Sequence, residues 1–598
     1  MTHDFVSVRN LRFLLNEMLH APEVLGEHDY FEEYNEETYN MVLDAALGIA
    51  EKEIFPYFKD MDRQSAKYED GTIKVHPRVR NIITAMAEGG WIGSSNSYEQ
   101  GGQQMPTCLA MAGAFIFYAA GVNGSAYAFL TQGAANLIQS FGSQDLKDYY
   151  IPNMYAGKWQ GTMALTEPQA GSSLSDVTTT AYPQPDGSYR IKGQKIYISG
   201  GDMDVVDNIV HLLLARIEGA PAGTKGISLF VVPKYRQNDS GELVANDVTT
   251  AGQYEKMGAK NYVAAHLMFG EQDDCHAWLV GSENRGLSHM FQMMNEARIA
   301  TGIMAAGEAS AAYYASLKYA KERPQGRHVD DKDVSKPQVP IIEHADVKRM
   351  LLFQKAVVEG SIALLSYCSL LQDLHHVTGY EDHFLLLDLL TPIAKTYPSE
   401  AGIDAVSQGL QVLGGAGFTK DFPLEQIYRE IRINAIYEGT TGIQGMDLLG
   451  RKVTQHNGKA FKLLMQAIKG DLEASVHDQA KPWATKLQNA TKQVHGVTLD
   501  LLKVAQSGEI KLFLADATLY LEMFGLMVMG WMWFKQGNTA LLTLENGVDG
   551  VDERNFYNGK VITMRFFYEY ELPKIEYLAK RLQNTDGLTM NTRAEVLV

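Results

Sequence analysis

The sequence predicts a multidomain α+β protein, on three observations. At 598 residues the chain is too long for one compact core. Apolar residues follow helical spacing near both ends, while a central stretch contains β-rich runs divided by turns. We therefore expect an N-terminal helical domain (1–160), a middle antiparallel β-domain (161–285), a helical-bundle domain (286–450) and an extra C-terminal helical domain (451–598).

Each predicted domain has its own pattern. Phe13, Leu14, Met18 and Leu19 recur at helical spacing. Three β-rich runs separated by Gly-, Pro- and Asp-containing turns predict strands over residues 189–199, 209–217 and 226–233. Helical periodicity resumes at Leu287, and a polar, Pro-containing stretch over residues 322–340 predicts a surface loop.

Charge and cysteine content limit the partners. The formal net charge is −18, which argues against nucleic acid as the main partner, because phosphate binding needs a basic face. Three dispersed cysteines form neither a CxxC pair nor a metal-ligand spacing, so we expect no metal site and a reducing compartment. The N-terminus lacks a secretory pattern. We expect a cytoplasmic protein.

Two apolar stretches, residues 108–130 and 512–534, resemble membrane spans in length. Asn123 interrupts the first, and Asp516 and Glu522 lie within the second, where a charge would be costly in a bilayer. Buried helices are the preferred interpretation of both. From Arg451 to the end, the sequence has 18 basic and 16 acidic residues. A membrane-surface contact of this C-terminal region remains the alternative.

The segment Ile-Tyr-Glu-Gly-Thr-Thr-Gly, residues 436–442, places Glu438 between an apolar run and a flexible turn. Poor solvation raises a carboxylate's pKa toward the working pH, as a general base requires. By itself the segment is weak evidence, because Glu beside Gly is common in turns.

Three further segments suit a planar or phosphate-bearing ligand. Residues 163–174 (MALTEPQAGSSL) end a strand in exposed N–H groups and hydroxyls, although an ordinary turn explains them equally well. Tyr197 and Ser199 alternate on a strand and so point the same way, as a cross-strand packing pair also would. Residues 411–418 (QVLGGAGF) lack the strand–GxGxxG order of a dinucleotide fold, which leaves a glycine C-cap or a close approach to a cofactor.

The four segments ALTEPQAGSS, KIYISGG, QVLGGAGF and IYEGTTGIQ occur in the order and at the separations of acyl-CoA dehydrogenases. The chain resembles that family over about residues 80–450. With its long N-terminal part and C-terminal extension, it resembles the bacterial subgroup of about 600 residues. That subgroup includes long-chain acyl-CoA dehydrogenases and 3-methylmercaptopropionyl-CoA dehydrogenase.

The resemblance implies FAD as cofactor and α,β-dehydrogenation of an acyl-CoA thioester, with Glu438 as the base and flavin N5 as the hydride acceptor. The implied cofactor-binding residues are Leu165, Thr166, Gly171, Ser172, Tyr197, Ser199, Arg323, Gln411, Gly415 and Thr440. The implied substrate-binding residues are Met163, Ser172, Arg298 and Gly439. Arg323 would reach the FAD of a neighbouring subunit, with Gln411 and Gly415 facing it.

The sequence departs from the family pattern at two places. After Arg323 the family shows an aromatic residue and Gly, whereas this chain continues Pro-Gln-Gly into the long loop, which weakens the implied contact across subunits. Some members carry the base just before the arginine that matches Arg298, but here that position is Ala297. The preceding Glu296 points about 100° away on a helix and is expected to be a surface charge.

The resemblance also implies partners and leaves alternatives open. We expect an electron-transfer flavoprotein as electron acceptor and a homodimer, with a tetramer as the alternative, in fatty acid β-oxidation. A 3-methylmercaptopropionyl-CoA dehydrogenase is one alternative and an acyl-CoA oxidase another. An AidB-like, DNA-associated flavoprotein of the same fold is a third, and it would need a more basic C-terminal face than the sequence provides.

Overall fold

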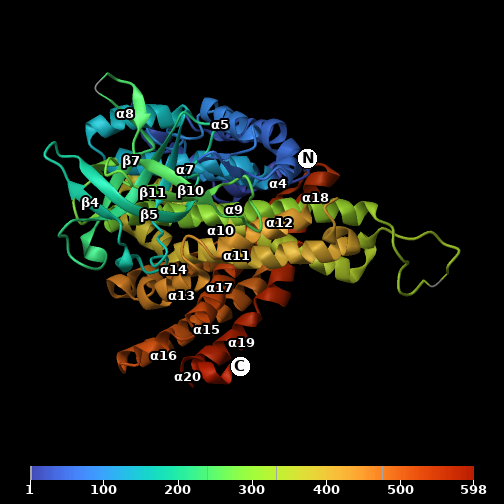
Figure 1. The fold of residues 1–598 in the computed structure, drawn as a ribbon. Coiled ribbons are helices and arrows are strands. Elements are labelled where there is room, and N and C mark those ends of the chain that lie inside the picture. Colours follow the sequence, from blue (N-terminus) through green and yellow to red (C-terminus); the bar gives the residue numbers. More distant parts are fainter. Residues whose placement is uncertain (1–2, 239, 332, 475) are drawn as a thin grey trace. The chain divides into compact units, whose positions relative to one another are not determined.

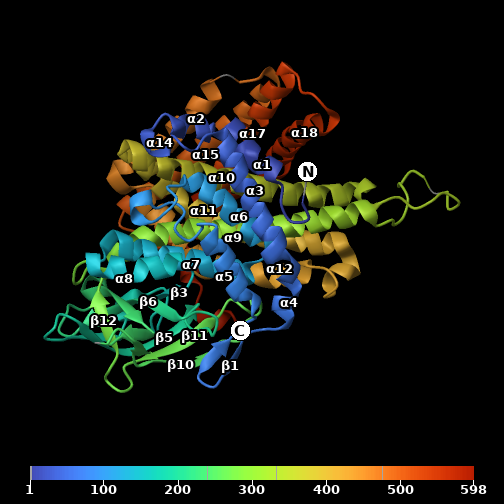
Figure 2. The same ribbon diagram turned by 90° about the horizontal axis from the view of Figure 1, so that it is seen from above.

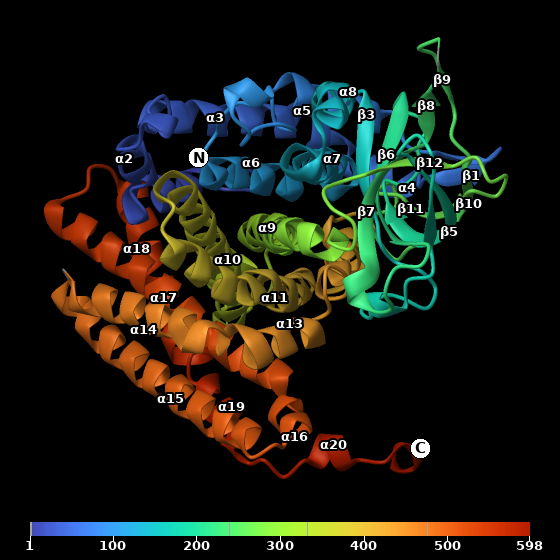
Figure 3. The same ribbon diagram turned by 90° about the vertical axis from the view of Figure 1, so that its left-hand side faces the viewer.

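The computed structural model describes residues 3–238, 240–331, 333–474 and 476–598. The chain forms two compact units (Figures 1, 2 and 3). The sheet unit contains Asp44–Met105 and Ile116–Ala297. The helical unit contains Met1–Leu43, Pro106–Phe115 and Arg298–Val598. The α+β class predicted from the sequence is confirmed.

The sheet unit is built on an eight-stranded sheet with the order β10-β11-β5-β12-β7-β6-β3, in which β4 pairs with β5 and β6. The strands are β3 (Trp159–Ala164), β4 (Thr180–Pro183), β5 (Tyr189–Ser199), β6 (Asn208–Ile217), β7 (Ile227–Pro233), β10 (Val248–Gln253), β11 (Ala264–Phe269) and β12 (His276–Leu279). The three strands predicted from the sequence correspond to β5, β6 and β7.

The sheet is mixed, whereas the sequence predicted an antiparallel one. β6 pairs in parallel with both β3 and β4, and the remaining pairs are antiparallel. β3 precedes the other strands and is separated from β6 by a long excursion that includes β4 and β5, so its direction is not set by a tight hairpin. Two hairpins complete the strands, β1 (Lys67–Glu69) with β2 (Thr72–Lys74) and β8 (Tyr235–Gln237) with β9 (Leu243–Ala245). The first hairpin lies in the stretch predicted to be helical.

Helices cover one side of this sheet (Figure 3). α7 (Val122–Phe141) and α8 (Gln144–Tyr155) share a buried core with β3, β6 and β7 that includes Leu137, Met154 and Val210. α4 (Phe58–Arg63) and α5 (Arg78–Glu88) belong to the same unit. The apolar core fixes the ends of β3 and β5, from which the glycine-containing turn segments emerge.

The helical unit contains the long helices of the predicted bundle. These are α9 (Gly286–Glu322, in this unit from Arg298 on), α10 (Ala345–Thr378) and α11 (Glu381–Leu413), followed by α12 (Leu424–Ile431) and α13 (Thr441–Asp447). The loop between α9 and α10 projects beyond the helix ends, as predicted (Figure 1). Backbone hydrogen bonds between Gln325 and Val339 and between Val339 and Gly326 close its base.

N-terminal and C-terminal helices also belong to this unit. Near the N-terminus are α1 (Val8–Arg12), α2 (Ala21–Gly26), α3 (Glu36–Ile49) and α6 (Thr107–Ala120), the last two continuing into the sheet unit. The C-terminal helices are α14 (Gln455–Glu473), α15 (Lys481–Gln506), α16 (Ile510–Leu514), α17 (Ala517–Asn546), α18 (Val551–Phe566), α19 (Lys574–Gln583) and α20 (Leu588–Asn591).

Buried ionic contacts tie these ends together. Lys560 of α18 is fully buried and lies 2.8 Å from both Glu359 Oε2 of α10 and Gln536 Oε1 of α17. It also donates to Asn10 of α1. The N-terminal and C-terminal helices are therefore joined by a buried cation inside one unit.

Within the part of the chain that the structure describes, two helices, α10 and α17, are long and apolar enough to cross a membrane by length and composition. In each, most of the apolar window is buried inside the protein, 78% in α10 and 83% in α17. The apolar stretch at residues 108–130 is divided between α6 and α7, because Gly121 has a φ of +154° and breaks the helix. The structure thus supports the interpretation of both stretches as core helices.

Candidate active site

The turn after β3 carries Leu165 and Thr166 and is closed by its own backbone. Glu167 and Ala170 exchange two N–H···O bonds of 3.0 Å each. The Ile196 N–H donates to the Thr166 carbonyl at 2.9 Å, which attaches the turn to β5. Met163 is partly buried on the core side of β3, whereas Gly171 and Ser172 follow the turn and are exposed.

Below this turn lies an ion pair that the sequence reasoning missed. Lys195 Nζ lies 2.8 Å from Glu167 Oε1 and 3.0 Å from the Leu165 carbonyl. Glu167 also accepts from Thr178 and from the Thr179 N–H. Burial acts to raise the pKa of Glu167, but Lys195 and these hydrogen bonds outweigh it and lower that pKa to about 2. The turn therefore rests on a buried, fully bonded carboxylate.

Tyr197 and Ser199 lie on the outer side of β5, while Ile196 and Ile198 between and beside them are buried. A bulge in the pairing of β5 with β11 accompanies a φ of +58° at Tyr197. The Tyr197 side chain is 58% exposed, and its ring centroid lies 4.2 Å from that of Tyr254. An exposed aromatic face beside the Thr166 turn is a suitable support for a flat ring system.

Glu438 follows the short 3-10 helix η10 (Arg432–Ala435) and precedes α13. Its φ is +54° and that of Gly439 is +86°, so two successive residues are left-handed. Gln444 of α13 holds this turn by donating to the Glu438 and Gly439 carbonyls at 3.2 and 3.3 Å. Thr440 caps α13 by accepting from the Ile443 N–H at 3.4 Å.

A series of buried hydrogen bonds holds Tyr437, the residue before Glu438. The Tyr437 hydroxyl donates to Asn434 Oδ1 at 3.0 Å, and Asn434 Nδ2 lies 2.6 Å from Glu308 Oε2. Burial, with the charge of Glu430, raises the pKa of Glu308 well above its ordinary value. These contacts join α9 to the segment that carries Glu438.

Opposing effects act on the pKa of Glu438. Burial raises the pKa of its carboxyl, while the charges of Lys395 and Arg298 act in the opposite direction. Arg298 is buried and forms an ion pair of 2.8 Å with Asp447. Among the described residues no acceptor takes the Glu438 N–H, which leaves that donor for a ligand.

Glu296 corrects one expectation. We expected a surface charge, but in the sheet unit its carboxyl is largely buried and accepts a hydrogen bond from Asn136. Burial raises the pKa of Glu296 to about 7. The expectation was wrong because the direction of a helical side chain was judged without the core that packs around α9.

Arg323, Gln411 and Gly415 are exposed. Arg298 lies on α9 and Arg323 directly follows its last residue, so 25 residues at 1.5 Å each separate the two by about 37 Å. The ring of Tyr319 lies 5.3 Å from that of Phe422, which places the end of α9 beside the loop that follows residues 414–418. Arg298 and Arg323 thus cannot contact the same small group within one chain.

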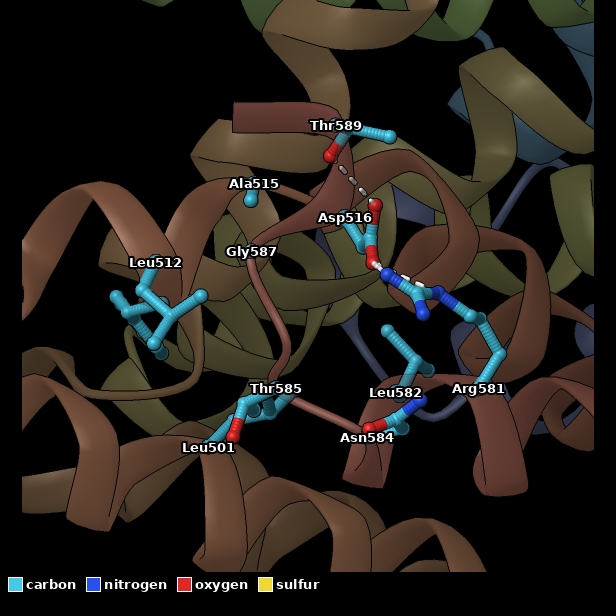
Figure 4. A pocket seen from close by; sticks show the side chains of 11 residues that line it. Leu501, Leu512, Ala515, Asp516, Arg581, Leu582, Asn584, Thr585, Gly587 and Thr589 are labelled. Carbon is cyan, nitrogen blue, oxygen red and sulfur yellow. Dashed lines mark hydrogen bonds and ion pairs between the residues drawn. The ribbon is translucent and has the colours of Figure 1, made fainter. Parts of the chain in front are cut away.

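A pocket in the C-terminal region does not qualify as a ligand site (Figure 4). It lies beside α16 and α19, and its volume of about 10 Å³ has room for roughly one water molecule. The Arg581 guanidinium is held there by Asp516 and Asp586, with Nη2 3.0 Å from each carboxylate. This arrangement is a structural clamp.

Few sequence features indicate the residues that support the site. The strand pattern places Lys195 at a core-facing position, and a lysine there could have indicated a buried ion pair. The place of Glu167 in the turn could have indicated its partner. Lys395 and Gln444 are polar residues inside helices, and only their burial in the folded protein distinguishes them from other polar residues. Gln444 is the last residue of the segment IYEGTTGIQ, but its hydrogen bond to the Glu438 carbonyl depends on the turn geometry.

The helical unit holds a desolvated carboxylate in a left-handed turn, and the sheet unit holds a turn of exposed donors beside an aromatic face. Each is a feature of cofactor-dependent oxidoreductases. Comparison with known proteins identifies the family. The descriptions "Acyl-CoA dehydrogenase, N-terminal domain", "middle domain" and "C-terminal domain" match residues 36–158, 162–271 and 284–453. "Acetyl-CoA dehydrogenase C-terminal like" matches residues 463–593. The chain belongs to the acyl-CoA dehydrogenase family, FAD-dependent oxidoreductases that act on CH–CH bonds.

Relatives match along almost the whole chain. A butyryl-CoA dehydrogenase of Syntrophomonas wolfei is 33% identical over 100% of both chains. A 3-methylmercaptopropionyl-CoA dehydrogenase of Ruegeria pomeroyi is 33% identical over 97% of each. The broad-specificity linear acyl-CoA dehydrogenase FadE5 of Mycobacterium tuberculosis is 32% identical over 98% of each. The predicted resemblance to the subgroup of about 600 residues is confirmed.

Solved structures share the fold. Caenorhabditis elegans ACDH-11, in complex with C11-CoA, has a TM-score of 0.76 at 19% identity and covers 98% of this chain and 95% of its own. An acyl-CoA dehydrogenase from Bacillus anthracis, complexed with FAD, has a TM-score of 0.73 at 21% identity over 96% and 91%. In the sheet unit, the exposed hydroxyls after β3 and the open face of Tyr197 fit the polar groups and the flat ring of a flavin nucleotide. In the helical unit, Gln444 Oε1 is buried and has no partner among the described residues.

Proposed function

We propose that Glu438 is the catalytic base of an acyl-CoA dehydrogenase reaction. The observation that carries the proposal is the setting of its partly buried carboxylate, held in a left-handed turn, with a pKa raised by desolvation. A base of this kind removes a weakly acidic proton best when its pKa lies near the working pH. The α-carbon of an acyl-CoA thioester carries such a proton.

Glu438 removes the α-proton, and its own N–H donates to the thioester oxygen, where negative charge develops. FAD, when bound, supplies the acceptor for the hydride that leaves the β-carbon. Gln444 keeps the Glu438 carbonyl turned inward, so that the N–H and the carboxylate of one residue serve the same substrate. Arg298, already paired with Asp447, maintains the helix beside this turn, and Gly439 leaves room for the thioester.

The test uses Glu438→Gln with Glu296→Gln as the matched control. Both changes replace a partly buried carboxyl of raised pKa by its amide, so a general effect of burial would appear in both. Glu438→Gln should retain FAD and bind acyl-CoA but lose flavin bleaching, measured anaerobically, by about a hundredfold to ten-thousandfold. Bleaching at the wild-type rate in Glu438→Gln, or its loss only in Glu296→Gln, would reject the assignment.

For the substrate, we propose a linear acyl-CoA, since relatives named for butyryl-CoA and for linear acyl-CoA match the whole chain. The relative named for 3-methylmercaptopropionyl-CoA matches equally well and gives the second candidate. Anaerobic titration with saturated acyl-CoAs of increasing length and with 3-methylmercaptopropionyl-CoA distinguishes them. The substrate is the one that bleaches the flavin at the lowest concentration.

For the partners, we propose a homodimer in the cytoplasm and an electron-transfer flavoprotein as electron acceptor. The separation of about 37 Å between Arg298 and Arg323 supports a role of Arg323, Gln411 and Gly415 toward the FAD of a second copy. A solved structure described for an electron transferring flavoprotein of Acidaminococcus fermentans shares the fold, with a TM-score of 0.57. Sedimentation tests the homodimer. Reduction of added electron-transfer flavoprotein, compared with oxygen uptake during turnover, tests the electron acceptor.

A further inference from the structure

Lys395 of α11 is a buried amine with no bonded partner. Its residue is 0% exposed, and its Nζ makes no hydrogen bond with any described residue. An ammonium without a partner is costly to bury, so an isolated lysine is uncommon in a protein core. The charge must be compensated by groups that act on it without contact.

Helix α11 carries Lys395 to the segment that contains Glu438. α11 packs against η10 and α13, the two elements that flank Glu438. Glu400, further along the same helix, accepts a hydrogen bond from the hydroxyl of Thr441, three residues after Glu438. α11 is thus anchored to this turn from one side, which fixes the position of Lys395 relative to it.

The charges that act on Lys395 are Glu400, Glu438 and Arg298. The two carboxylates stabilise its charged form, and the arginine opposes it. The charges that act on Glu438 are Lys395 and Arg298. Arg298 already has its own carboxylate, Asp447, at 2.8 Å. Lys395 is therefore the cation near Glu438 whose charge no direct contact neutralises.

We propose that Lys395 is a positioning residue for the dehydrogenation, whose buried ammonium holds the Glu438 carboxylate in its ionised form before substrate arrives. The inference rests on the proposed role of Glu438 as base. Desolvation alone would favour the protonated carboxyl, which cannot accept a proton. An uncompensated cation inside the protein counteracts that tendency without occupying the face of the carboxylate that substrate needs.

The pH dependence follows from this arrangement. The base acts in its deprotonated form, so the rate rises with pH through the pKa of Glu438. Removal of a nearby positive charge raises the pKa of a carboxyl, by about one unit or more at close range. Lys395→Met should therefore move the acid limb to higher pH, with about tenfold slower flavin bleaching on that limb and an unchanged plateau above it.

The experiment compares four full-length FAD-loaded proteins across pH: wild type, Lys395→Met, Lys395→Arg and Lys452→Met. Lys452 is a matched control, because it is also fully buried in the helical unit but is paired with Asp388 and does not act on Glu438. Lys395→Arg keeps the charge and should keep the acid limb. Lys452→Met should lower stability without moving the limb.

A second readout does not depend on turnover. The carboxyl band of Glu438, identified in infrared difference spectra by its loss in Glu438→Gln, should titrate at higher pH in Lys395→Met than in wild type. An unchanged midpoint in both measurements, with FAD retained, overturns the proposal. If Lys395→Met does not fold, a midpoint in Lys395→Arg that moves upward overturns it instead. Flavin bleaching at the wild-type rate in Glu438→Gln would reject the role of Glu438 as base, and with it the role of Lys395.

Discussion

Lys195 Nζ and Glu167 Oε1 lie 2.8 Å apart, with the two side chains 0% and 1% exposed. The pair connects β5 to the turn after β3, because Lys195 also donates to the Leu165 carbonyl. A buried charge pair contributes little beyond an apolar pair, but loss of one partner leaves the other charge uncompensated. The turn that carries Thr166 is therefore sensitive to either residue.

Lys195→Met should lower the free energy of unfolding by about 3–5 kcal/mol and weaken FAD retention, because Glu167 is left buried and unpaired. Thermal denaturation and the flavin-to-protein absorbance ratio measure the two effects. Lys192→Met is the control: Lys192 lies on the same strand in a solvent-exposed pair with Asp273, which contributes little to stability. Equal losses in both variants would contradict the role of the buried pair.

The same pair predicts an acid limit of stability. The folded-state pKa of Glu167 is about 2, below its ordinary value of 4.5, so its contribution is fully present above pH 4.5. As pH falls from 4.5 toward 2, the unfolded chain takes up the proton first and stability is lost, on the order of 3 kcal/mol. Urea unfolding between these pH values should show this loss in wild type. A Lys195→Met protein should show a smaller slope.

Gly439→Ala should reduce turnover with little loss of structure. Gly439 has a φ of +86°, and a Cβ there would lie 2.5 Å from Gln444 Nε2, which holds the Glu438 carbonyl. The strained turn costs about 1–2 kcal/mol, and the displaced amide lets Glu438 rotate away from its position. Anaerobic bleaching should slow by about tenfold to a hundredfold, since a small misplacement of a catalytic group has that effect.

Gly442→Ala is the matched control for this change. Gly442 lies in the same GTTG segment but within α13, has no left-handed φ, and a Cβ there would meet only Thr440 Oγ1, at 3.8 Å. The substitution should be neutral or slightly stabilising, because Ala favours a helix over Gly. A similar rate loss in both variants would show that the segment as a whole, and not the Gly439 turn, sets the rate.

Lys560→Met should destabilise the helical unit by about 3–5 kcal/mol, because it leaves Glu359 with a lost partner inside the protein. The double variant Glu359→Leu/Lys560→Met should recover much of this loss, since both charges are then absent. Lys486→Met, in an exposed pair with Glu569, is the control. If the double variant is as unstable as the single one, the pair contributes through packing and not through charge.

Regular elements with strong apolar patterns could be predicted from sequence, and the outcome of each prediction has a physical cause. The strands β5, β6 and β7 and the loop after Glu322 were correctly placed, because alternation and polar turn residues are local signals. The parallel pairing of β6 with β3 and β4 was missed, because strand direction depends on contacts between distant residues. Glu438 was predicted as a base from its own segment, whereas Lys395 lies about 40 residues earlier in an apolar helix, and only the folded structure shows that it is buried.

The contact between Asn10 and Lys560 joins residues 550 positions apart in the chain. At synthesis rates of 5–20 residues per second, the amino-terminal helix waits roughly 30 to 110 s before its partner leaves the ribosome. The sheet unit, whose residues all precede Arg298, is complete much earlier. A nascent chain that stops before α18 should therefore expose the apolar side of α1, and chaperone binding to such chains should be strongest in that interval.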